Sequence, residues 1–113
     1  DNKKIELSIL SAPSRGETSA TDKIRWLKKH APFIHRDDYI FARKKYMVKG
    51  DVFVDDYPVN IENYRKEWPN ATIMTIAYPF NESVKYLTDV YAQDYKDSER
   101  AWDEITTAIE DMA

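Results

Sequence analysis

The chain contains no cysteine and only two glycines among its 113 residues. Without cysteine it can form neither a disulfide framework nor a thiolate metal site. The two glycines, Gly16 and Gly50, stand far apart. A glycine-rich phosphate loop and the dinucleotide-binding fingerprint both need several closely spaced glycines. These two classes of nucleotide-binding protein are therefore excluded.

Long apolar runs and basic clusters are missing as well. No apolar run approaches the about 20 residues that cross a bilayer, and no apolar signal region follows residues 1–4. The net charge is -3, and the basic runs at 28–29 and 43–45 are short, whereas a phosphate backbone is bound by clustered Lys and Arg. We therefore expect a soluble, cytoplasmic protein that binds neither membranes nor nucleic acid polymers.

The composition fits one folded domain. Hydrophobic residues make up 42% of the chain and charged residues 33%, which supplies both a core and a solvated surface. A chain of this length buries about 60–70% of its unfolded surface. We expect a single domain over residues 1–113.

The apolar pattern predicts strands that alternate with helices. This alternation implies an α/β layer fold with a mostly parallel sheet. In such sheets ligands bind beyond the carboxyl ends of the strands. We expect strands at 5–10, 39–42, 52–54 and 72–76 and helices at 19–31, 58–68 and 102–112, while 82–97 fits either a helix or a loop.

Four polar residues are placed where such a sheet binds ligands. Ser11 follows the first strand, Lys23 falls in the first turn of the first helix, and Asp55 and Asp56 follow the strand at 52–54. A hydroxyl can bind a phosphate oxygen, a lysine can balance its charge, and carboxylates can hold Mg²⁺. Adjacent carboxylates repel each other unless a cation is near. The set therefore indicates phosphate chemistry.

Each of these residues also has a structural interpretation. The sequence Asp-Asp-x-Pro suits a turn that begins a helix, Ser11 suits a turn, and Lys23 suits a solvated helix surface. The ordered set is more specific than its members. A receiver domain also combines an acidic pair, a Ser or Thr and a Lys, but it places the acidic pair first and the Lys last, so the order argues against it.

Three segments resemble motifs two, three and four of the 5'(3')-deoxyribonucleotidases, within the haloacid dehalogenase (HAD) superfamily. They read ILSAP at 9–13, KIRWL at 23–27 and GDVFVDDYPVNI at 50–61, and Asn81 and AWDEI at 101–105 are similar to the family's ending. The resemblance implies a HAD-like Rossmannoid three-layer sandwich. It also implies Mg²⁺-dependent hydrolysis of nucleoside monophosphates, a phosphoric monoester hydrolase activity of the 5'-nucleotidase type.

The resemblance also assigns roles to the four polar residues. Ser11 and Ala12 bind the substrate phosphate, and Lys23 steadies the phosphate and the nucleophile. Asp56 is the direct Mg²⁺ ligand and Asp55 its neighbour. These roles make Ser11 and Lys23 the catalytic residues within this chain.

The family's first motif, Asp-x-Asp, occurs nowhere in the 113 residues. In the family this motif supplies the Asp that is phosphorylated and the Asp that acts as general acid and base. We therefore expect a C-terminal portion of such a phosphatase, without its motif-one strand and without activity as an isolated chain. The alternative is a non-catalytic domain of the same fold that binds a nucleotide or a protein partner as a regulator.

In the family the motif-one strand lies between the motif-two strand and the Asp-Asp strand, so a gap is expected in the sheet. Unpaired strand edges favour association. Three arrangements would close the gap: the strand at 5–10 pairs with that at 52–55, a second copy or partner supplies a strand, or a complementing N-terminal segment does. We expect association rather than a lone open sheet.

Overall fold

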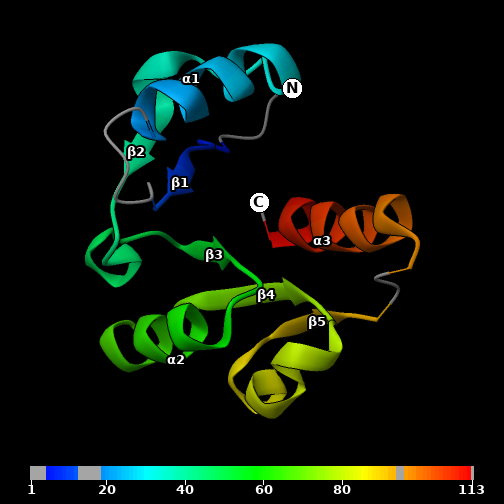
Figure 1. Ribbon diagram of the computed structural model, residues 1–113. Coiled ribbons are helices and arrows are strands. Elements are labelled where there is room, and N and C mark those ends of the chain that lie inside the picture. The colour runs from blue at the N-terminus through cyan, green and yellow to red at the C-terminus, as the bar shows by residue number, and fades with distance from the viewer. Residues whose placement is uncertain (1–4, 13–18, 94–95, 113) are drawn as a thin grey trace. The chain divides into compact units, whose positions relative to one another are not determined.

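The computed structural model describes residues 5–12, 19–93 and 96–112. The chain divides into two compact units, residues 1–45 and 46–113 (Figure 1). One domain over residues 1–113 stays a prediction. Within the described ranges, every helix is too short or too polar to span a membrane.

Among its described residues, the first unit contains two short parallel strands, one α-helix and the short 3-10 helix η1 (Arg36–Asp38). Strand β1 (Ile9–Ser11) pairs with β2 (Tyr39–Phe41), and helix α1 (Ser19–His30) lies between them in the sequence. The pairing continues past the strands, because the Ala42 N–H donates to the Ser11 carbonyl oxygen over 2.9 Å. The expected strand at 5–10 begins later than predicted, since residues 5–8 are exposed and have no regular structure.

The second unit contains a three-stranded sheet in the order β3-β4-β5, with both strand pairs parallel. The strands predicted at 52–54 and 72–76 are confirmed. The segment 82–97, which fitted either a helix or a loop, contains the larger part of a 3-10 helix that begins at residue 79. A strand follows that the sequence analysis did not predict. The elements are β3 (Val52–Val54), α2 (Pro58–Glu67), β4 (Thr72–Ile76), η3 (Pro79–Leu87), β5 (Val90–Ala92) and α3 (Ser98–Met112).

Helices cover both faces of this sheet (Figure 1). On the face toward α3, Met74, Ile76 and Ala92 of the strands pack with Ala101 and Ile105 of the helix. Strand residues alternate between faces, so the neighbours of these residues point toward α2 and η3. The predicted α/β class with a parallel sheet is confirmed, and this unit has the three layers that the resemblance implies.

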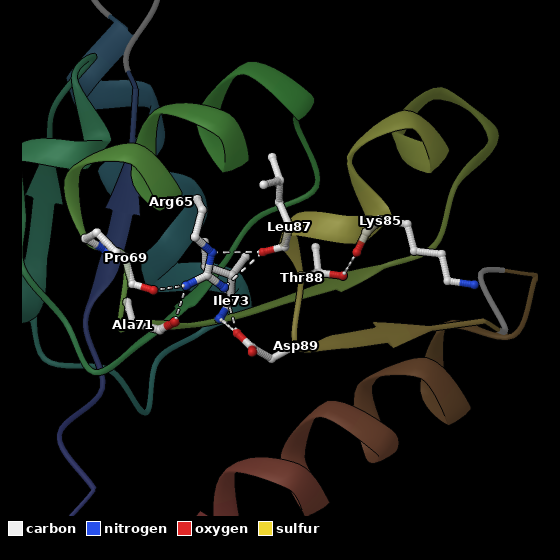
Figure 2. A network of polar contacts seen from close by, with 8 residues as sticks. All are labelled: Arg65, Pro69, Ala71, Ile73, Lys85, Leu87, Thr88 and Asp89. Atoms are coloured by element: carbon white, nitrogen blue, oxygen red, sulfur yellow. Dashed lines mark hydrogen bonds and ion pairs between the residues drawn. The ribbon is translucent and has the colours of Figure 1, made fainter.

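Arg65, near the end of α2, joins that helix to the segments that lead into β4 and β5 (Figure 2). Its Nη2 lies 2.8 Å from Oδ2 of Asp89, and the same carboxylate oxygen accepts the Ile73 N–H over 2.8 Å. The guanidinium also donates to three carbonyl oxygens, those of Pro69, Ala71 and Leu87. Arg65 therefore bonds to the backbone that leads into β4 and β5, at the amino ends of these strands. Ligands bind at the opposite edge of such a sheet, beyond the carboxyl ends of the strands.

Candidate functional site

Asp55 and Asp56 follow β3, and the structure gives them different environments. The Asp55 carboxylate accepts the Tyr57 N–H over 2.9 Å and the Nδ2 group of Asn60 over 3.1 Å. These bonds hold the turn between β3 and α2, which begins at Pro58. Asp55 therefore forms the turn that the Asp-Asp-x-Pro sequence suits, while the N-cap residue of α2 is Tyr57, which has no side-chain cap.

The Asp56 side chain is exposed. Across the described ranges, no donor bonds to its carboxylate. The same ranges hold no group of three or more acidic or histidine side chains close enough to bind a metal ion. A cation at Asp56 would thus gain few protein ligands in this unit. Mg²⁺ tolerates this, because it commonly keeps several waters beside one or two carboxylates.

Asn81 is fully buried, with 0% of its surface exposed, in the first turn of η3. Its Nδ2 lies 3.1 Å from the Asp56 carbonyl oxygen and 3.0 Å from that of Ile76. Its Oδ1 accepts the Tyr78 N–H over 3.0 Å and the Tyr91 hydroxyl over 2.9 Å. One amide therefore connects the ends of β3 and β4 to β5.

A hollow of about 260 Å³ lies beside this amide, where β4 and β5 end. Burial, with the nearby Glu82 carboxylate as a smaller cause, raises the pKa of the Tyr91 hydroxyl above its usual 10.0. The Lys85 ammonium lies 5.4 Å from the centre of the Tyr91 ring. The hollow thus combines aromatic surface with charges of both signs. Its lining residues are Ala77, Tyr78, Pro79, Glu82, Lys85, Tyr91 and Gln93.

Ser11 and Lys23 lie in the first unit. Ser11 is the last residue of β1, as predicted, and is half-buried, and Ala12 after it is exposed. Lys23 is half-buried in α1, four residues beyond Ser19, where the first turn passes into the second. The structure thus describes the phosphate-binding candidates in one unit and the acidic pair in the other. Asp55 and Asp56 stand together at the carboxyl end of β3.

The chain matches one family model over residues 3–108, that of "5' nucleotidase, deoxy (Pyrimidine), cytosolic type C protein". It is 41% identical over 44 residues to the 5'(3')-deoxyribonucleotidase of Clostridium acetobutylicum, a stretch that covers 39% of this chain and 24% of that protein. Proteins of the same name from Bacillus subtilis and Bacillus phage SPbeta are each 27% identical over 62 residues, covering 55% of this chain and 36% of each relative. The chain thus spans well under half the length of these relatives.

Proposed function

This chain belongs to the deoxy 5'-nucleotidase family that it matches over residues 3–108, and we propose that it forms the phosphate-binding and metal-binding part of a phosphatase for nucleoside monophosphates. The proposed reaction is hydrolysis of the phosphate ester in the cytoplasm, with Mg²⁺ as the cofactor. One observation carries the proposal. Asp56 presents an exposed carboxylate at the carboxyl end of a parallel strand, without a donor among the described residues.

Each candidate residue takes one role in this proposal. Ser11 donates its hydroxyl to a phosphate oxygen, and the main chain at Ala12 lies beside the same phosphate. Lys23 balances the negative charge of the phosphate. Mg²⁺, when bound, neutralises charge on the phosphate during transfer, and Asp56 holds it, while Asp55 keeps the turn around Asp56 in place.

A Mg²⁺ titration tests the metal site directly. We expect millimolar Mg²⁺ to shift the backbone amide signals of residues 53–58, because a single carboxylate binds a hydrated ion weakly. Asp56→Asn keeps the size of the side chain but removes its charge, so it should abolish the shifts. Lys66→Gln, which removes a charge from an exposed residue of α2, is the control and should leave them unchanged. Amide signals at 53–58 that do not move would mean that the acidic pair only forms a turn.

An activity assay tests the reaction. The 113 residues contain no Asp-x-Asp, and a covalent aspartyl route needs such a nucleophile. We therefore expect no phosphate release from deoxynucleoside monophosphates by this chain alone. Addition or fusion of a segment that carries the family's Asp-x-Asp should restore release, and Asp56→Asn should abolish it again. Turnover by the chain alone would contradict this and require another nucleophile.

The second candidate function is a non-catalytic domain that binds a nucleotide or a protein partner. The same missing Asp-x-Asp favours it, because such a domain would keep the phosphate-binding residues without the nucleophile. The two candidates differ in one result. A regulatory domain should bind a deoxynucleoside monophosphate, with shifts at Ser11 and Lys23, yet stay inactive when the Asp-x-Asp segment is supplied.

A homo-oligomer or a complementing N-terminal segment is also part of the proposal. The strands form two sheets. In one, β1 pairs with β2, and in the other, β4 pairs with β3 on one side and β5 on the other. Within the described ranges β1 and β3 each pair on one side only. A further strand, from a second copy or a separate segment, would satisfy the open side of such a strand.

A further inference from the structure

We infer that Asn81, held by Tyr91, is a positioning residue that fixes the main chain at Asp56 so that the Asp56 carboxylate faces a cation. The inference deepens the proposed function and rests on the metal site assigned there to Asp56. Its basis is a set of hydrogen bonds around one buried amide, described above.

The orientation of the Asn81 amide is determined by main-chain groups. The Tyr78 N–H can only donate, so the atom 3.0 Å from it is Oδ1. The carbonyls of Asp56 and Ile76 can only accept, so they face Nδ2. The Tyr91 hydroxyl then adds a second donor on the Oδ1 side. If the amide were rotated by half a turn, so that Oδ1 and Nδ2 exchanged places, these hydrogen bonds would be lost.

This amide gives the Asp56 main chain a fixed anchor. Asn81 is 0% exposed, and a hydrogen bond in such surroundings is electrostatically stronger than one in water. The Tyr57 N–H, which belongs to the same peptide group as the Asp56 carbonyl, donates to the Asp55 carboxylate over 2.9 Å. The peptide group that directly follows Asp56 is therefore held at both its oxygen and its N–H, while the Asp56 side chain stays exposed.

A fixed main chain lowers the cost of metal binding, because the carboxylate does not lose freedom of its backbone when the ion arrives. Partners that orient a metal ligand without touching the ion typically change metal affinity by about 10- to 100-fold when they are removed. A residue that served only the core would change stability and leave the affinity of the folded protein unaltered. This difference separates a positioning role from a structural one.

The test is a Mg²⁺ titration followed by the amide signals of residues 53–58 in three variants of the 113-residue chain. Asn81→Ala removes the whole amide, and we expect the dissociation constant to rise about tenfold, the lower end of the range for such partners. Tyr91→Phe removes a single hydroxyl and should raise it by about two- to tenfold, the equivalent of one hydrogen bond. Tyr86→Phe removes a hydroxyl from a side chain that is 80% exposed on the same 3-10 helix and should leave the constant unchanged.

Tyr91→Phe keeps the test decisive if Asn81→Ala does not fold, because the Tyr78 N–H still bonds to Asn81. If the parent chain binds Mg²⁺ and folded Tyr91→Phe binds it equally well, the positioning role is overturned while the metal site stands. If the parent chain shows no response to Mg²⁺, the metal site and this inference both fall. Weaker binding in Tyr91→Phe, with binding in Tyr86→Phe unaltered, supports the inference.

Discussion

The ring of Tyr64 lies flat against the ring of Phe53, with their centres 3.9 Å apart and their planes 1° from parallel. Tyr64 belongs to α2 and Phe53 to β3. The Tyr64 hydroxyl donates to the Val48 carbonyl oxygen over 2.9 Å and accepts the Gly50 N–H over 2.8 Å. One side chain thus joins the helix to the strand that leads to Asp55 and to the segment before that strand.

Tyr64→Phe should keep the stacked rings and lose both hydrogen bonds. The Gly50 N–H and the Val48 carbonyl would be left without their partner, so we expect a loss of about 1–3 kcal/mol in the free energy of unfolding. Urea unfolding followed by far-UV circular dichroism measures it. Tyr86→Phe, at a side chain that is 80% exposed, is the control and should change stability by less than about 0.5 kcal/mol.

The same hydroxyl predicts a change of stability at high pH. Burial raises the pKa of Tyr64 above 10.0, with the Asp51 carboxylate as a smaller cause and the Gly50 hydrogen bond acting against both. The folded protein thus holds this proton more tightly than the unfolded chain does. The resulting stabilisation is fully present below pH 10 and is lost as the pH rises through the folded-state pKa.

Unfolding free energies between about pH 8 and about pH 11, across the tyrosine range, test this. The parent chain should lose stability above pH 10 more steeply than Tyr64→Phe, which has no proton to release at this position. Other groups that titrate in this range affect both proteins alike and cancel in the difference. Parallel curves would show that Tyr64 has the same pKa in the folded and unfolded states.

Arg65→Lys keeps the positive charge and removes the planar set of donors. A lysine ammonium cannot reach the carbonyls of Ala71 and Leu87 and the Asp89 carboxylate with the geometry that the guanidinium has (Figure 2). We expect a loss of about 1.5–3 kcal/mol, the range for hydrogen bonds to a charged group. The readout is urea unfolding. Arg43→Lys, at an exposed residue of the first unit, should be neutral, and equal effects of the two variants would contradict the role of this network.

The strands and helices that the sequence predicted well are those with strong local signals. Val52–Val54 and Thr72–Ile76 are apolar runs between polar or turn-forming residues, and Pro58 marks the start of α2. Strand β5 has only three residues and no alternation that could be recognised. It forms because Asp89 bonds to the Ile73 N–H beside it and because Ala92 packs into the core under α3, and both contacts are distant in the sequence.

The 3-10 helix η3 did leave a signal that the sequence analysis missed. Asn81, Val84 and Leu87 are spaced by three residues, which is the repeat of a 3-10 helix, and the first two are buried. A buried Asn in such a row is unusual and points to a hydrogen-bonded role. The different environments of Asp55 and Asp56 could not be read from the sequence. They depend on Asn60 and Asn81, which reach this turn from α2 and η3.

The open side of β3 carries the last prediction. Asp55 donates its N–H to the Met74 carbonyl of β4, and successive N–H groups of a strand point in opposite directions. The Val54 N–H therefore faces the open side. An unpaired group that cannot reach water costs about 1–3 kcal/mol. Of the arrangements that would satisfy this side of β3, we expect association, in which a second copy or a separate segment supplies a strand.

We expect the chain to sediment as an oligomer, or to retain a peptide that intact mass measurement detects. Val54→Pro removes the N–H on the open side of β3 but leaves the hydrogen bonds between β3 and β4 in place. It should therefore reduce association. Val54→Ala truncates the same side chain but keeps its N–H, and it should associate more strongly than Val54→Pro. A parent chain that stays monomeric at every concentration, with no peptide bound, would contradict the prediction. Equal association of the two variants would mean that copies meet elsewhere than at this edge of β3.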